Sequence, residues 1–375
     1  MTGRLGGEND RGDNGVSPQL NVGEHGGESM DKQKRDFLKA AGAAAVGAST
    51  LGFPHVARAQ QVHRWKVQSL WSAQELTFKV FQEYCERIKK LTNGRLEITP
   101  FSAGAVTGVF ETLDAVSAGV LQGQSSWPGY WTGKEPGLAV ISDFVFGYTH
   151  PWQQDAWFHY KGGLQMLEEA YNKFNMHVIG LSWWGVESIP SKKPIRNMAD
   201  FKGVKFRSPQ GMTAEILTKL GASVVVLPGG EVYSALDKGV VDAADWATIS
   251  MNQRMGFHEV AKFPIYPGFH SMPVQDFAVN MNAWKALPDD VKVILESSAR
   301  EWGWDQVERV AVDDIRVVQE IKQKGGVTLV SWSDENLRKI RALAVQTWDD
   351  WSKKSPLAKK AADSQKAWLK DLGLL

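Results

Sequence analysis

One arginine in the middle of the chain has the chemistry needed to hold a carboxylate. Arg207 lies in residues 204–208, a short run in which apolar and polar residues alternate as in a strand. Its planar guanidinium group can donate two parallel hydrogen bonds to a carboxylate, a geometry that lysine does not offer. Taken alone, an arginine in a strand is more often a surface residue, so a binding role for Arg207 depends on the sequence around it.

Tryptophan is the second residue type of interest, with 16 in the chain. Trp183 and Trp184 end a strand-like run and precede Glu187, and Trp246 ends the segment Val-Asp-Ala-Ala-Asp-Trp. Indole rings combine a large apolar area with one N–H donor, so a pocket walled by them would suit an apolar or aromatic acid. Further candidates for this wall are Trp127 and Trp131. Core packing is the alternative role for several of these rings.

Motifs of the common enzyme classes are missing from the sequence. No Gly-x-Gly-x-x-Gly follows a strand pattern, no Gly-x-Ser-x-Gly elbow occurs, and no two histidines have metal-binding helical spacing. The 43 basic and 42 acidic residues give a net charge of +1, which argues against a nucleic-acid or membrane-surface partner. Cys85 is the single cysteine and has apolar neighbours, which indicates a packing role. We therefore predict a binding protein, not an enzyme.

The N-terminus has the pattern of an export signal. The pair Lys34-Arg35 precedes an Ala/Gly-rich apolar run, and Ala57-Arg58-Ala59 supplies small residues around a cleavage site. The pair is similar to a twin-arginine (Tat) signal with lysine as its first residue, which leaves both Tat and Sec export open. We expect residues 30–59 to be the signal peptide and translation to start at Met30; the alternative is that residues 1–29 form a disordered leader. The predicted location is the periplasm.

The rest of the chain alternates between strand and helix patterns. Strand patterns occupy residues 63–71, 95–101, 177–184, 204–208 and 222–227. Helix patterns occupy residues 74–93, 109–119, 211–220, 231–238, 289–324, 334–353 and 356–369. Repetition of this kind predicts the α/β class, in which helices cover a sheet.

Two lobes with a hinge are expected, because the chain crosses over near residues 180–190 and returns near residues 270–280. We assign residues 60–183 and 271–300 to lobe I, residues 184–270 to lobe II, and residues 301–375 to long C-terminal bracing helices. Two lobes joined by more than one crossing can close on a ligand while only a few residues absorb the rotation.

Several segments resemble, in chain order, the periplasmic solute-binding subunits of TRAP (tripartite ATP-independent periplasmic) transporters, the DctP family. These segments are residues 91–98, 101–104, 201–209, 227–236 and 239–246. The Pro-Gly-Gly-Glu element, the Asp-Trp ending at Trp246 and the Tyr-Pro-Gly-Phe-His element at residues 266–270 look most like the branch that binds monocarboxylate 2-oxoacids. The resemblance implies the two-lobed periplasmic binding protein fold with a hinge and long C-terminal helices.

The resemblance also implies functional residues and partners. It places the carboxylate-binding arginine at Arg207 and a ligand contact at Trp246. The other candidates for the cleft are Trp183, Trp184, Glu187, Gln210, Asp245 and Ser271, with residues 146–148 as weaker ones. The implied partners are a small organic acid and the membrane permease subunits. A homodimer through the C-terminal helices stays open, and a sensor that delivers its ligand to a kinase or chemoreceptor is the alternative function.

One position departs from the pattern of the 2-oxoacid branch. Members of that branch have an acidic metal ligand directly after the histidine of the Pro-Gly-aromatic-His element, and this chain has Ser271 there. A Na⁺ or Ca²⁺ ion would lose its main anionic oxygen ligand. If an ion is present, the remaining ligands are the Trp246 backbone, Glu187 and Asp245. We expect binding of the acid without a metal ion and without any other cofactor.

Overall fold

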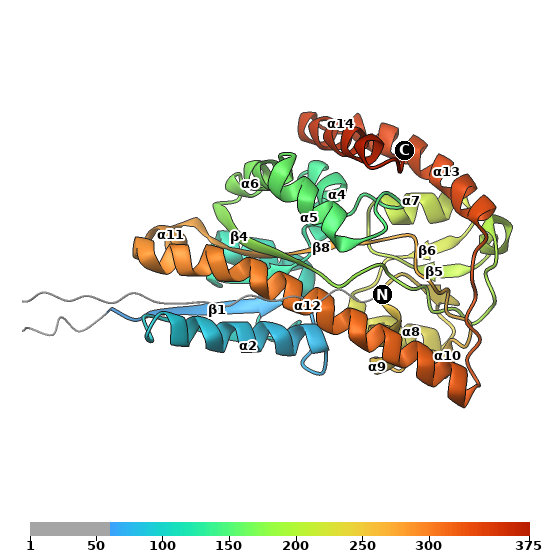
Figure 1. The fold of residues 1–375 in the computed structure, drawn as a ribbon, viewed down its shortest axis with the longest axis horizontal. Helices are drawn as coiled ribbons and strands as arrows, with labels where there is room; N and C mark the ends of the chain where they lie inside the picture. Colours follow the sequence, from blue (N-terminus) through green and yellow to red (C-terminus); the bar gives the residue numbers. More distant parts are fainter. Residues whose placement is uncertain (1–60) are drawn as a thin grey trace, which may run out of the picture. The chain divides into compact units, whose positions relative to one another are not determined.

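The computed structural model describes residues 61–375, so the predicted leader and signal peptide lie outside the described part. Within these residues, a five-stranded sheet has the order β2-β1-β3-β8-β4, and a three-stranded sheet has the order β6-β5-β7. Helices pack around both sheets (Figure 1), as expected for the α/β class. None of the helices in residues 61–375 combines the length and the apolar character that a bilayer crossing needs.

The five-stranded sheet mixes parallel and antiparallel pairs. Its parallel strands are β1 (His63–Ser69), β2 (Leu96–Phe101) and β3 (Gly123–Ser126). The returning strand β8 (Val274–Asn280) inserts between β3 and β4 (Met176–Trp183) and is antiparallel to both. Every residue of β8 is buried. The strand that leaves this sheet and the strand that re-enters it are therefore direct neighbours, which places both interlobe crossings side by side.

Helices of the first lobe cover this sheet on the apolar faces that the sequence pattern indicates. Helix α2 (Leu76–Leu91) buries Phe78, Phe81 and Ile88 at helical spacing, and the buried Cys85 lies on the same helix, which confirms its packing role. The other helices of this lobe are η1 (Val109–Glu111), α3 (Thr112–Ser117), η2 (Pro128–Trp131), α4 (Gly137–Ser142), α5 (Pro151–Tyr160), α6 (Gly163–Asn172) and α11 (Met281–Lys285).

The three-stranded sheet is parallel throughout. Its central strand is β5 (Lys205–Arg207), flanked by β6 (Ser223–Val225) and β7 (Ala243–Ala244). The helices of this lobe are η3 (Met198–Phe201), α7 (Met212–Lys219), η4 (Gly229–Glu231), α8 (Val232–Asp237), α9 (Ile249–Arg254) and α10 (Phe257–Val260). Because parallel strands end at the same edge, Arg207 and the residues after β7 meet at the carboxyl edge of this sheet, where ligands bind in open α/β sheets.

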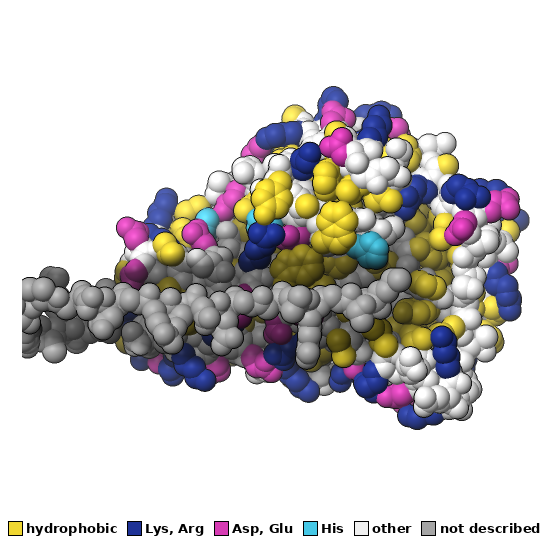
Figure 2. All heavy atoms as spheres, viewed as in Figure 1, with side chains coloured by type: hydrophobic (Ala, Val, Ile, Leu, Met, Phe, Trp, Pro, Cys, Tyr) yellow, Lys and Arg dark blue, Asp and Glu magenta, His cyan; other side chains and the backbone are white. Residues whose placement is uncertain are grey.

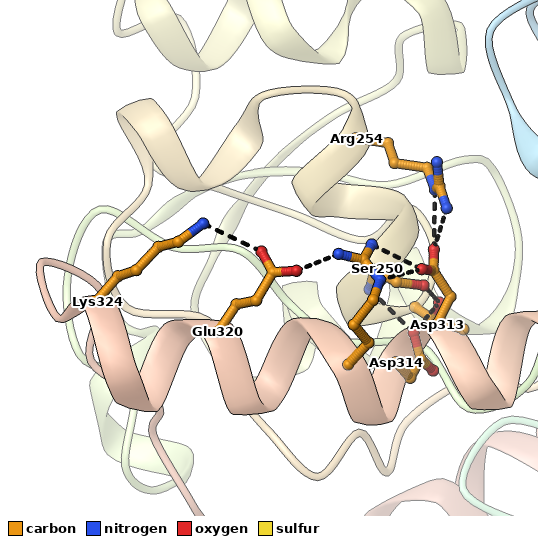
Figure 3. A network of polar contacts seen from close by, with 8 residues as sticks. Ser250, Arg254, Asp313, Asp314, Glu320 and Lys324 are labelled. Atoms are coloured by element: carbon orange, nitrogen blue, oxygen red, sulfur yellow. Dashed lines mark hydrogen bonds and ion pairs between the residues drawn. The ribbon is translucent and has the colours of Figure 1, made fainter.

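Helix α12 (Asp289–Lys324) contacts elements of both lobes, packing on β4 and α2 and also on α9. Gly303 of α12 lies against β4, since a Cβ atom there would meet the Leu181 carbonyl oxygen at 2.2 Å. At the other end of α12, Arg254 of α9 donates to Asp313, and the Ser250 amide donates to Asp314 (Figure 3). The long helix is therefore fixed to each lobe by different contacts.

The last two helices also join both lobes. Helix α13 (Asp334–Ser352) packs on α7, and α14 (Pro356–Asp371) packs on α4. Ser333 and Ser355 cap them, each accepting a backbone N–H through its hydroxyl oxygen. The lobe boundaries stay a prediction. They place the five-stranded sheet in lobe I and the three-stranded sheet in lobe II.

Candidate functional site

A cavity of about 150 Å³ lies between the two lobes. Its wall is largely aromatic, with Trp71, Trp127, Tyr130, Trp184 and Trp246. Its polar side chains include Asp143, Glu187, Arg207, Asp245 and Ser271. Apolar walls with a few convergent polar groups are typical of small-molecule sites.

Arg207 lines this cavity and is only 3 % exposed. Its Nε and one terminal nitrogen donate to the Leu227 carbonyl at 3.0 and 2.9 Å, and the other terminal nitrogen donates to the Asp245 carbonyl. A guanidinium group has five N–H donors. One hydrogen on each terminal nitrogen therefore has no partner among residues 61–375, and the two together can meet a carboxylate.

The aromatic wall joins side chains from both lobes. The ring of Trp71 makes edge contacts with Trp184, at 4.9 Å between centroids, and with Trp246, at 5.8 Å. Three indole nitrogens have fixed acceptors: Gln275 for Trp71, Glu187 for Trp184 and the Gly229 carbonyl for Trp246. The buried Nε1 of Trp127 has no partner among the described residues, which leaves it free to donate to a bound molecule.

Two carboxylates and one imidazole cluster beside Arg207. Nε2 of His270 lies 3.2 Å from Oδ1 of Asp245 and 3.6 Å from Oε2 of Glu187. Burial, and then the charge of Asp245, raise the pKa of Glu187 well above its ordinary value. Burial also acts to raise the pKa of Asp245, but the hydrogen bond and charge of His270 outweigh it and lower that pKa overall. The two carboxyl groups titrate together, and Asp245 loses its proton more readily than Glu187 does.

The same three side chains are a candidate cation site. One ligand atom from each of Glu187, Asp245 and His270 lies within 4.8 Å of the others. Oε2 of Glu187 is buried and accepts no hydrogen bond from residues 61–375. That oxygen can be satisfied by a cation or by its own proton, which the raised pKa favours.

Asp143 was not predicted from the sequence. It follows α4, lines the cavity and is 4 % exposed. The Ser271 hydroxyl donates to its Oδ2 at 2.5 Å, and the Met272 amide donates to its Oδ1 at 3.3 Å. Burial raises the pKa of Asp143 to about 7, although the hydrogen bond from Ser271 lowers it in part. A third acidic group thus lies at the site. It is hydrogen-bonded to Ser271, the residue that stands where the 2-oxoacid branch has an acid.

Several predicted side chains lie elsewhere. Trp183 is in the core of the first lobe and donates through Nε1 to Gln154 at 2.8 Å. It and Trp184 are consecutive in extended chain, so they point to opposite sides, and only Trp184 faces the cavity. Trp131 is buried and donates to the Phe110 carbonyl. Gln210 lines a small neighbouring void of about 10 Å³, and Phe146 lines another void of that size beside His270.

The family model described as bacterial extracellular solute-binding protein, family 7 (DctP), matches residues 67–354. The chain belongs to this family. Its members are solute receptors of the TRAP class, and the resemblance seen in the sequence is confirmed. A curated relative is the monocarboxylate 2-oxoacid-binding periplasmic protein of Nostoc sp. (strain PCC 7120), which is 31% identical over 311 residues, 82% of this chain and 85% of the relative.

Solved TRAP receptor structures share the DctP fold. A receptor from Rhodobacter sphaeroides in an apo, open structure has 34% identity and a TM-score of 0.68, covering 83% of this chain and 99% of that one. A receptor from Bordetella bronchiseptica has 29% identity and a TM-score of 0.77, covering 84% and 93%. That second structure is a mixed-occupancy dimer in which one site holds copurified calcium and picolinate and the other is apo. The two-lobed fold expected for this chain is therefore confirmed.

Proposed function

We propose that this DctP receptor works in the periplasm, binds a small monocarboxylate in the interlobe cavity and delivers it to the membrane subunits of a TRAP transporter. The observation that carries the proposal is the pair of unpartnered N–H groups on the otherwise fixed guanidinium of Arg207. The ligands of the Nostoc relative, 2-oxoacids, and of the Bordetella receptor, picolinate, support this solute class. The aromatic wall suits planar or aromatic acids as well as 2-oxoacids.

Binding in this proposal is a closure reaction without chemistry on the solute. The carboxylate meets Arg207 from the second lobe, while Trp71 and Trp127 of the first lobe cover the rest of the solute. Closure shifts the population towards the form in which both lobes contact the ligand. We assign no catalytic role to any of the cavity residues.

The site does not require a metal ion in our proposal, although calcium accompanies picolinate in the Bordetella receptor. A Ca²⁺ or Na⁺ ion prefers several oxygen ligands. Ser271 offers no carboxylate, and its hydroxyl is already bonded to Asp143. His270 Nε2 lies 3.2 Å from Asp245 and 3.6 Å from Glu187, so its N–H can occupy Asp245 in place of a cation. The third acid at the site, Asp143, already accepts hydrogen bonds from Ser271 and the Met272 amide, so these residues fit an ion less well than a set with a free third carboxylate would.

A thermal-shift screen of the mature protein against a library of carboxylic acids tests the proposed function. A ligand that binds only the folded state adds roughly 3 kcal/mol of stability when its concentration is 100 times its Kd, and so raises the melting temperature. We expect stabilisation by one or more monocarboxylates and much less by the matching carboxamides, because the two free N–H groups of Arg207 bind a charged acceptor more strongly than a neutral one. Stabilisation by amides or sugars, with no effect of any acid, would overturn the proposal.

A further inference from the structure

Asp143 and Arg207 approach the cavity from opposite lobes. Arg207 ends the central strand of the three-stranded sheet, and Asp143 follows α4 beside the five-stranded sheet. Both line the same cavity. A solute held by its carboxylate at Arg207 therefore presents another of its groups to Asp143 when the lobes close.

The carboxyl group of Asp143 acts as a hydrogen-bond acceptor in this structure. Oδ2 accepts from Ser271 and Oδ1 accepts from the Met272 amide, the latter at a long 3.3 Å. A carboxylate has about four lone-pair sites, so acceptor capacity remains. The raised pKa of Asp143 indicates that these two donors do not offset the cost of burying the charge. A further donor at this position would stabilise the ionised form.

The charges around the cavity also favour a further hydrogen-bond donor at Asp143. Three acidic side chains, Asp143, Glu187 and Asp245, face the cavity, and the basic groups beside them are Arg207 and His270. A bound carboxylate adds a fourth acidic group. Asp143 then faces a bound anion, while its hydrogen-bond donors among residues 61–375 are the neutral Ser271 hydroxyl and Met272 amide. A donor on the solute itself supplies the missing compensation.

We infer that Asp143 is a specificity-determining residue, and that the preferred solute is a monocarboxylic acid that also carries a hydrogen-bond donor, a hydroxyl or a protonated nitrogen, directed at Asp143. The inference rests on the proposed function, since it takes the solute carboxylate to be at Arg207. The Ser271 hydroxyl donates to one oxygen of Asp143 and so competes with a solute donor for that carboxylate. Acids of the same shape that lack a donor bind less well.

Calorimetric titration with matched probes tests this inference. The probes are benzoate against 2-, 3- and 4-hydroxybenzoate, and pyruvate against lactate. For wild type we expect at least one donor-bearing acid to bind about tenfold or more tighter than its matched partner, the effect of one charge-assisted hydrogen bond. In Asp143→Asn that ratio should fall below about threefold, while the partner without a donor binds more tightly because a negative charge has been removed.

A second variant keeps the test decisive if Asp143→Asn does not fold. Ser271→Ala removes one donor from Asp143, so the preference for donor-bearing acids should increase. Equal binding within every matched pair, failure of all donor-bearing acids to bind wild type, or a ratio unchanged in both variants would overturn the inference. Arg207→Lys separates this failure from that of the proposed function. If acids bind with dependence on Arg207 but show no donor preference, only the role of Asp143 is lost.

Discussion

At Arg207, the protein uses three of the five guanidinium donors to hold the side chain in place. The carbonyl groups of Leu227 and Asp245 accept these hydrogen bonds. A fixed side chain loses little conformational freedom when a solute arrives, so more of the interaction energy appears as affinity. We therefore expect a substitution at Arg207 to lower the affinity more than a substitution in the aromatic wall does.

Whether the site needs a bound cation depends on three residues, Glu187, Asp245 and His270. Removing metal ions with a chelator, in sodium-free buffer, should leave the affinity for the best acid within about twofold, because His270 lies between Glu187 and Asp245. Calorimetry before and after chelation measures this. A fall in affinity of tenfold or more, about 1.4 kcal/mol, restored by Ca²⁺ or Na⁺, would show that an ion is part of the site.

Motifs in the sequence led to some cavity residues and missed others. Arg207, Asp245 and Trp246 lie in segments that match the family, and Trp184 and Glu187 were expected at the crossover strand; the cavity contains all five. Asp143 and Trp71 are distant from those segments and meet them only through folding. A signal for Asp143 exists in retrospect, since it is one charged residue within the apolar run 138–146, and a buried acid is costly unless it has partners.

At the scale of elements, local patterns predicted the helices and strands better than their partners. The helix expected at residues 289–324 is α12 with the same ends, and the strand expected at residues 204–208 contains β5. Helices α4, α5 and α6 were not predicted; α5 has buried Gln153, Gln154 and Asp155 and so lacks a clear apolar stripe. The insertion of β8 between β3 and β4 depends on long-range pairing that no local pattern encodes.

Gly303→Ala should destabilise the protein, although alanine normally favours a helix by roughly 0.5–1 kcal/mol over glycine. The added Cβ would meet the backbone oxygen of Leu181 at 2.2 Å and push α12 away from β4. Overpacking of this kind costs about 1–3 kcal/mol, measurable by urea unfolding. Gly133→Ala is the matched control, because a Cβ there meets nothing within 4 Å. Equal stability of the two variants would refute this packing argument.

The contact between α9 and α12 leads to a second prediction about stability. Asp313 accepts hydrogen bonds from Arg254 of α9 and from Arg316, and it is 8 % exposed (Figure 3). Asp313→Ala should lower the free energy of unfolding by about 1 kcal/mol, because Arg254 loses its acceptor while solvent weakens the hydrogen bonds of these partly exposed arginines. Glu320→Ala, at the exposed end of the same network, should lower the free energy of unfolding less than Asp313→Ala does. An effect of Glu320 equal to that of Asp313 would contradict this assignment.

At the scale of the molecule, residues 61–375 have the features of a receptor that closes. Helix α12 and the pair α13–α14 connect the two sheets outside the crossing strands. The TM-score is lower against the open Rhodobacter receptor, 0.68, than against the Bordetella receptor, 0.77, even though the sequence identity is higher, 34% against 29%. The Rhodobacter structure is an apo, open form, and the Bordetella structure has one occupied site and one apo site.

The surface agrees with a role in which the ligand is small. Lys, Arg, Asp and Glu side chains of both signs are interspersed on the face seen in Figure 2, in keeping with the net charge of +1. A single-sign field that would attract a nucleic acid is not seen on this face among the described residues. In the proposed function, recognition rests on the few polar groups of the interlobe cavity, with Arg207 as the main one.

Calorimetric titration of wild type and Arg207→Lys with the acid that stabilises the protein most tests the central claim directly. Lysine keeps the charge but loses the two parallel hydrogen bonds, so we expect affinity to fall about 100-fold, or roughly 2.7 kcal/mol. The circular dichroism spectrum should stay unchanged, and Thr218→Ala on the exposed side of α7 should bind as wild type does. Unchanged affinity in a folded Arg207→Lys protein would contradict the account.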